Sequence, residues 1–98
     1  MAEFSVELVP AAVRDLDDVD QAFRHKLLRV TEAQLGANPF PRGKLIKRLQ
    51  GFRIPTYELR VRGARETYRV VYRIEGRRVV ILMIPPRKLL ERCLRRLK

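Results

Sequence analysis

The stretch YELRVRGARETYRVVYRI, residues 57–74, carries the strongest structural signal in the chain. Apolar and cationic side chains alternate on both of its arms, and Gly63 lies between the arms. Side chains alternate across a strand, so the pattern predicts two strands, 56–62 and 67–74, joined as an antiparallel hairpin. One side of this hairpin carries tyrosine, leucine and valine. The other side carries Arg60, Arg62, Arg69 and Arg73.

Further elements are predicted on both sides of the hairpin. Residues 3–8 alternate as a first strand, and residues 11–35 place apolar residues at helical spacing. An acidic cluster interrupts that helical pattern, which predicts two helices or one broken helix, with Gly36 as the C-terminal stop. Residues 78–84 predict a third strand of the hairpin sheet. It is apolar at every position after Arg78, as is typical of a central strand covered on both faces.

The rest of the chain completes the predicted fold class. Residues 87–98 place leucines on one helical face, which predicts a C-terminal amphipathic helix. Residues 44–52 are compatible with a helical turn or with an extended lead-in. We therefore expect an α+β fold: an antiparallel sheet of about four strands, two N-terminal helices packed on one face, and a C-terminal helix. With 98 residues, the chain is expected to form a single domain, 1–98.

Charge is distributed unevenly along the chain. Residues 1–38 contain four basic and seven acidic side chains, a net charge of −3, whereas residues 39–98 contain eighteen basic and four acidic ones, a net charge of +14. Such an excess predicts a polyanionic partner, either nucleic acid or an acidic protein. No segment combines a basic face with exposed large apolar residues, which disfavours a membrane. Without a signal peptide or a long apolar run, a cytoplasmic location is expected.

We call the predicted surface formed by Arg60, Arg62, Arg69 and Arg73 the arginine face. Guanidinium groups this close repel one another, and a sheet optimised only for stability would intersperse carboxylates. Guanidinium groups bind phosphate oxygens in bidentate fashion and stack on bases, so a phosphodiester chain fits this surface. The alternative is an ordinary exposed face in a chain that contains seventeen arginines and five lysines.

Six segments resemble the RelE/ParE superfamily of toxins from bacterial toxin–antitoxin pairs. They are FSVELVPAAVRDL, NPFPRGKLIKRLQG, YELRV, YRVVYRI, VVILMI and PRK, which follow in the family's order over nearly the whole chain. YELRV is also similar to the HigB-like branch. The resemblance implies an antiparallel sheet with two N-terminal helices on one face. It also implies a metal-independent endoribonuclease that cleaves mRNA in the ribosomal A site and is neutralised by an acidic antitoxin.

The resemblance implies specific residues for this chemistry. Arg69 matches the family's phosphate-stabilising arginine, Arg60 and Arg62 match a basic pair on the preceding strand, and Arg87 matches an arginine after the last strand. These groups would assist attack of a ribose 2′-hydroxyl on the adjacent phosphate and stabilise the transition state. Contacts to mRNA and 16S ribosomal RNA are expected from Lys44, Lys47, Arg48, Arg65, Arg73 and Lys88. No cofactor and no metal ion are expected.

The chain departs from the nuclease pattern in two respects. Pro86 precedes Arg87, and the downstream tyrosine or histidine that helps proton transfer in many members is missing. Several nucleases of the family also have lysine, which can serve as a base, at the positions of Arg60 and Arg62. Arginine stays protonated and supplies charge only, so the general base has to be another group. The candidates are Lys88, Glu58, Glu66, a tyrosine and His25, although the helical pattern around His25 favours an ordinary surface histidine.

Two further interpretations therefore stay open: a ParE-like inhibitor of DNA gyrase, and a degenerate member that binds an antitoxin without catalysis. A metal hydrolase is disfavoured, because the aspartates of the acidic cluster occur at helix-start spacing and have no histidine or cysteine companion. These aspartates are Asp15, Asp17, Asp18 and Asp20.

Overall fold

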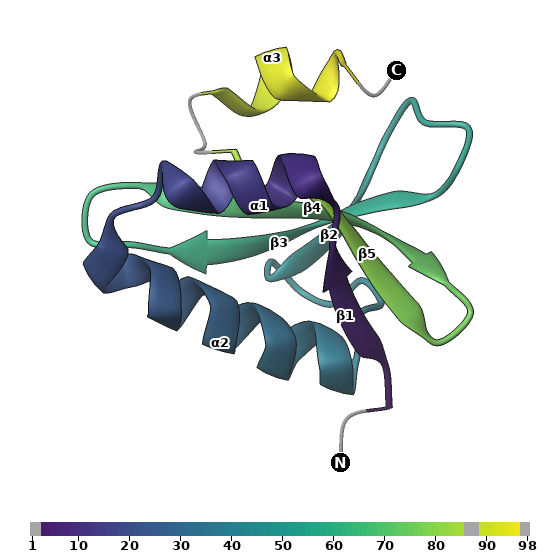
Figure 1. The fold of residues 1–98 in the computed structure, drawn as a ribbon. Helices are drawn as coiled ribbons and strands as arrows, with labels where there is room; N and C mark the ends of the chain where they lie inside the picture. The colour runs from purple at the N-terminus through teal and green to yellow at the C-terminus, as the bar shows by residue number, and fades with distance from the viewer. Residues whose placement is uncertain (1–2, 86–88, 97–98) are drawn as a thin grey trace.

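The structure, a computed structural model, describes residues 3–85 and 89–96. In these ranges one sheet contains the strands β1 (Ser5–Leu8), β2 (Ile46–Leu49), β3 (Thr56–Arg62), β4 (Thr67–Glu75) and β5 (Arg78–Met83). The helices are α1 (Pro10–Asp17), α2 (Gln21–Ala37) and α3 (Leu90–Leu94). Figure 1 places α2 and α3 on opposite sides of the strands.

The strands are arranged in the order β1-β5-β4-β3-β2. All neighbouring pairs are antiparallel except β1 and β5, which run parallel. The expected α+β class is confirmed, but the sheet has five strands in place of about four. The additional strand is β2, which pairs with β3 at the edge of the sheet. It lies within the segment 44–52, for which the sequence was compatible with either a helical turn or an extended lead-in.

The strands of the central hairpin have the predicted alternation. Tyr57 lies opposite Tyr72 and Leu59 opposite Val70, so the apolar side chains of β3 and β4 share one face. The predicted strand 78–84 is β5, an interior strand that lies between β4 and β1, whereas β4 holds the middle position of the sheet. A two-residue turn joins β4 to β5. Gly76 has a φ of 62° there, a conformation that glycine adopts without strain.

Helices α1 and α2 cover the apolar face of the sheet. Their buried residues Ala12, Leu16, Leu27 and Leu35 pack in one core with buried side chains of β3, β4 and β5. Pro10 is the first residue of α1, where its missing N–H costs no helical hydrogen bond. The predicted packing of two N-terminal helices on one face is confirmed.

Gly36 does not end α2 as predicted. The helix continues to Ala37, and Gly36 is buried in its last turn. The carbonyl oxygen of Gly36 accepts hydrogen bonds of 3.0 Å from the backbone N–H groups of Glu3 and Phe4. The glycine therefore lies against the segment that leads into β1.

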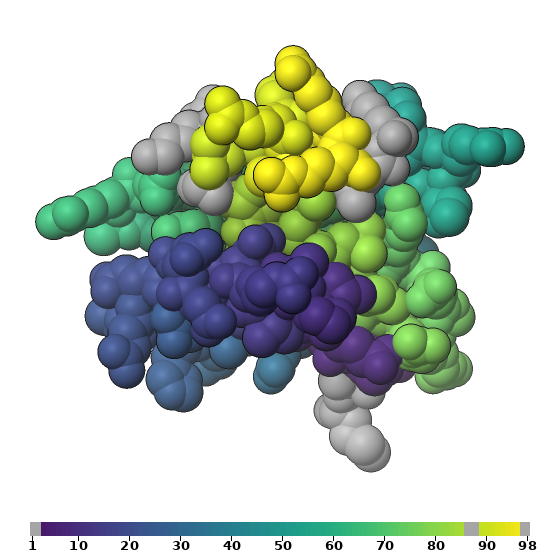
Figure 2. Space-filling model, turned by 45° about the horizontal axis from the view of Figure 1, so that its top comes forward, coloured from purple at the N-terminus to yellow at the C-terminus, as the bar shows by residue number. Residues whose placement is uncertain are grey.

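The C-terminal helix is confirmed over Leu90–Leu94 and is shorter than predicted, while residues 87, 88, 97 and 98 lie outside the described ranges. Figure 2 shows α3 in yellow on the surface, above the yellow-green residues around the end of β5. Within the described residues, none of the helices is long and apolar enough to cross a membrane.

Candidate nucleic-acid interface

The pairing of β3 with β4 brings the predicted catalytic arginines of these strands together. Arg60 lies directly opposite Arg69, and Arg62 lies opposite Thr67. These four residues line a cavity of about 220 Å³. Three cationic side chains therefore converge on one hollow, as the alternation pattern predicted for one face of the hairpin.

Arg69 is the most enclosed of the three arginines. It is 7% exposed, and its guanidinium Nη1 lies 4.0 Å from Oε1 of Glu58, which is also 7% exposed. Its backbone N–H donates a hydrogen bond of 3.1 Å to the carbonyl oxygen of Pro85. The segment that follows β5 therefore passes beside Arg69 and fixes the backbone at this position.

Arg73 shares the arginine face but lies outside the cavity. Its Nε donates a hydrogen bond of 3.3 Å to Oγ1 of the buried Thr56, whose hydroxyl in turn donates to the carbonyl oxygen of Ile54 at 2.8 Å. This network anchors the half-buried Arg73 against β3. Neither Thr56 nor the cavity residue Thr67 was predicted from the sequence. Each threonine is the first residue of its strand and lies an even number of residues from the arginines of that strand. Alternation could therefore have placed both on the arginine face.

The other predicted RNA-binding residues are spread over several places. Lys47 lies opposite Glu58 and belongs to the arginine face, whereas Arg48 lies opposite Tyr57 and alternates onto the other face of the sheet. Lys44 is exposed before β2. The predicted catalytic Arg87 and the predicted RNA-binding Lys88 fall outside the described residues.

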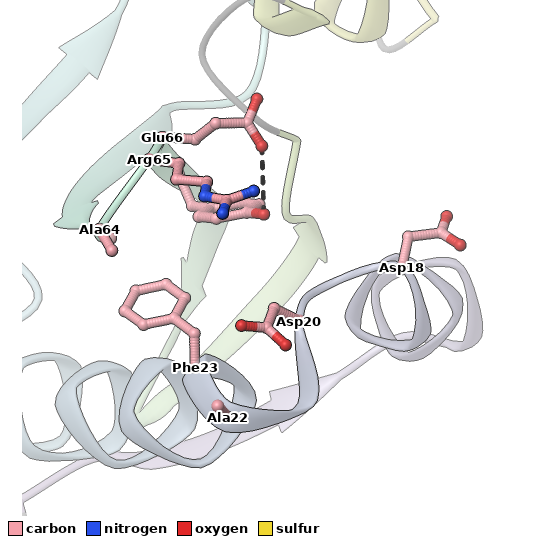
Figure 3. Close-up of a pocket in the computed structure, with 9 residues that line it drawn as sticks. Asp18, Asp20, Ala22, Phe23, Ala64, Arg65 and Glu66 are labelled. Atoms are coloured by element: carbon pink, nitrogen blue, oxygen red, sulfur yellow. Dashed lines mark hydrogen bonds between the residues drawn. The ribbon is translucent and has the colours of Figure 1, made fainter.

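Arg65 lines a different and larger hollow, of about 740 Å³, between the start of α2 and the β3–β4 turn. Figure 3 shows Asp20 and Phe23 on the helix side of this hollow and Arg65 and Glu66 on the turn side. The hydroxyl of Tyr68 donates a 3.3 Å hydrogen bond to Glu66. Partial burial, followed by the negative charge of Glu66, raises the pKa of Tyr68. This hollow carries several carboxylates, so it is electrostatically unlike the arginine cavity.

Within the acidic cluster, Asp15 has a structural partner. Oδ2 of Asp15 accepts a hydrogen bond of 2.9 Å from the backbone N–H of Ile84, which ties α1 to the end of β5. Asp20 is the residue before α2 but makes no side-chain cap. Within residues 3–85 and 89–96, no three histidine, cysteine, aspartate or glutamate side chains come together in a group suited to a metal ion.

No protein-family model matches the sequence, and no curated protein matches it either. The fold does find matches among solved structures. The toxin–antitoxin complex RelBE2 from Mycobacterium tuberculosis matches with a TM-score of 0.72 and 26% identity, over 89% of this chain and 94% of that chain. The chain has the fold of the RelE-like toxin superfamily.

Two further structures agree with this assignment. The RelE–RelB complex from Pyrococcus horikoshii matches with a TM-score of 0.67 and 25% identity, over 87% of this chain and 96% of the matched chain of the complex. A variant of the Escherichia coli toxin RelE in the free state matches with a TM-score of 0.66 and 17% identity, over the full length of both chains. At that identity, the third match shows a shared fold.

The candidate general bases of this RelE-like protein lie in different places. His25 is exposed on α2, which covers the apolar face of the sheet, and Glu66 lies at the other hollow beside Tyr68. Tyr72 faces the core. Glu58 alone among the candidate carboxylates in the described ranges lies beside the arginine cavity. The guanidinium groups of the cavity can bind and stabilise negative charge, but they cannot accept a proton.

Proposed function

We propose that this RelE-like chain is the toxin of a type II toxin–antitoxin system and that its arginine face binds RNA phosphates. The observation that carries this proposal is the cross-strand pair Arg60 and Arg69, which lines a cavity together with Arg62. A pair of like charges directly opposite each other destabilises a sheet. An anionic ligand offsets that repulsion, and a phosphate oxygen pair suits the planar guanidinium fork.

The reaction we propose is metal-independent cleavage of mRNA on the ribosome. The ribose 2′-oxygen attacks the adjacent phosphorus, a new O–P bond forms, and the bond to the 5′-oxygen of the next nucleotide breaks. The 2′-hydroxyl loses its proton and the leaving oxygen gains one. The arginines would stabilise the extra negative charge on the phosphate oxygens in the transition state, an interaction that is strong inside a partly buried cavity.

The proposed protein partner is an acidic antitoxin. The solved complexes from Mycobacterium tuberculosis and Pyrococcus horikoshii pair a RelE-like chain with an antitoxin. In this chain a net charge of +11 favours a partner rich in carboxylates. Apolar contact surface is available at exposed side chains: Val13, Phe40 and Ile54.

The test is translation on ribosomes with primer-extension mapping of the mRNA. Wild-type protein is expected to produce cuts within A-site codons. Arg62→Ala and Arg69→Ala are expected to lose most of these cuts. Arg62 is exposed, so its replacement leaves the core intact, whereas the buried Arg69 requires a check of folding by circular dichroism. Arg29→Ala, which removes an exposed charge from α2, is the matched control and should cut normally.

Intact mRNA and unaffected translation at saturating, folded wild-type protein would contradict the nuclease proposal. A gyrase supercoiling assay would then test the alternative function. If Arg29→Ala lost activity as fully as Arg62→Ala, net charge would explain the effect and the arginine cavity would not.

A further inference from the structure

We propose that Glu58 is an internal competitor for phosphate on the arginine face: it compensates the charge of Arg69 in the free protein and weakens the binding of a phosphodiester there. This inference rests on the proposed function only in naming RNA as the ligand. The arrangement that carries it is a buried carboxylate placed beside a buried guanidinium at the cavity.

Burial makes Glu58 unusual on this surface. Within the described ranges, the buried charged residues are Glu58 and Arg69, and Oε1 of Glu58 lies 4.0 Å from Nη1 of Arg69. A charge removed from water requires a compensating charge nearby. Each of these two residues supplies that charge for the other. Glu58 therefore occupies a position from which it competes with a bound anion for Arg69.

The pairing is incomplete on the side of Glu58. A separation of 4.0 Å is an ion pair without a hydrogen bond, and Oε2 of Glu58 is buried with no hydrogen-bond partner among the described residues. Nε of Arg60, opposite Arg69 in register, is also buried without a partner there. A carboxylate and a guanidinium that are both incompletely satisfied are expected to change partners at low cost when a phosphate enters the cavity.

Removal of this carboxylate has two opposite consequences. Arg69 loses its buried counter-charge while Arg60 stays directly opposite, so the folded sheet becomes less stable. At the same time the net positive charge of the cavity rises by one, so a phosphate is attracted more strongly. Lower stability together with tighter phosphate binding is a combination that a merely structural role for Glu58 does not produce.

The experiment compares Glu58→Gln with Glu75→Gln, which removes the same charge from an exposed residue at the end of β4. Affinity for a 2′-O-methyl RNA oligonucleotide, which cannot be cleaved by 2′-hydroxyl attack, is measured by titration calorimetry, and stability by thermal melting. We expect Glu58→Gln to bind roughly three- to tenfold more tightly and to melt at a lower temperature than wild type. Glu75→Gln should change the affinity by less than about twofold, since exposed charges are screened.

Unchanged or weaker binding by folded Glu58→Gln would overturn the inference. If binding were unchanged but cleavage were lost, Glu58 would be assigned the role of proton acceptor and not the role of competitor for phosphate. If Glu58→Gln does not fold, Glu58→Asp withdraws the carboxylate from Arg69 by one methylene and keeps the charge. It should bind more tightly than wild type, and equal affinity would contradict the inference.

Failure of the proposed function is distinguishable in the same experiment. If wild-type protein does not bind the RNA, the RNA proposal fails. Inorganic polyphosphate then serves as the probe for the competitor role: tighter binding by Glu58→Gln than by wild type supports it, and equal binding overturns it.

Discussion

The hydroxyl of Tyr72 donates a hydrogen bond of 2.6 Å to the carbonyl oxygen of Pro39, a residue 33 positions earlier in the chain. Both residues are fully buried. The bond links the centre of β4 to the loop that leads from α2 into the edge strand β2. It therefore holds the connection between α2 and the edge strand β2 against the middle strand of the sheet.

Tyr72→Phe is expected to destabilise the protein by about 1–2 kcal/mol, because it removes only the hydroxyl and leaves a buried carbonyl without its donor. Urea denaturation measures the change. Tyr57→Phe is the control: its ring stacks on Tyr72 with centroids 5.7 Å apart, but its hydroxyl makes no hydrogen bond to the described residues. Equal losses for the two variants would contradict a specific role for the bond to Pro39.

Stability should fall in alkaline solution because of the same tyrosine. Burial, reinforced by nearby Tyr57, raises the pKa of Tyr72 well above its ordinary value of 10.0. Above about pH 10 the unfolded chain loses this proton while the folded chain keeps it, so unfolding becomes more favourable by up to about 1.4 kcal/mol per pH unit. Tyr72→Phe should show a shallower fall between pH 9 and pH 11. The pKa of Tyr68 is also raised, so some alkaline loss should remain.

Asp15→Ala is expected to cost about 1–3 kcal/mol, because the N–H of Ile84 would lose its acceptor at a residue only 2% exposed. Asp15→Asn retains an acceptor oxygen and should recover most of the loss. Asp17→Ala, two residues on and exposed, should change the free energy of unfolding by less than about 0.5 kcal/mol. A large loss for Asp17→Ala would indicate a general charge effect in place of the hydrogen bond.

Gly63→Ala should destabilise the β3–β4 turn. A Cβ at this position would lie 2.8 Å from the carbonyl oxygen of Glu66, which already accepts a 2.7 Å hydrogen bond from the N–H of Gly63. The backbone must shift to relieve this contact, at an expected cost of about 1–3 kcal/mol. Ala64→Ser, at the neighbouring exposed position, is the control for thermal melting and should melt like wild type.

Arg62→Ala is expected to weaken RNA binding and to lower the slope of log affinity against log salt by about 1, as for the loss of one phosphate contact. Fluorescence anisotropy at several salt concentrations measures both. The control Arg78→Ala removes an equal charge from an exposed ion pair with Glu7 at the far end of β5. An identical slope change for the control would show that RNA binding depends on the overall charge of the protein and not on the arginine cavity.

Local patterns in the chain were sufficient for most elements. The range 56–62 predicted from YELRVR matches β3, and 67–74 differs from β4 by one residue. Alternation is a property of adjacent residues, so it assigned Arg60, Arg62, Arg69 and Arg73 to one face before their neighbours were known. The same alternation placed Tyr72 on the core side, where it is buried.

Other features depend on contacts between distant parts of the chain. The segment IKRL becomes a strand only because β3 offers an edge to pair with, and β5 is an interior strand only because β1, from the N-terminal end of the chain, pairs with its other side. Sequence also could not assign Arg48 and Lys47 to opposite faces, since the strand itself was undecided. Burial of Glu58 against Arg69 follows from the β3–β4 register and the neighbouring strands. Periodicity specifies which side chains share a face, whereas strand order specifies which of them are covered and which charges meet.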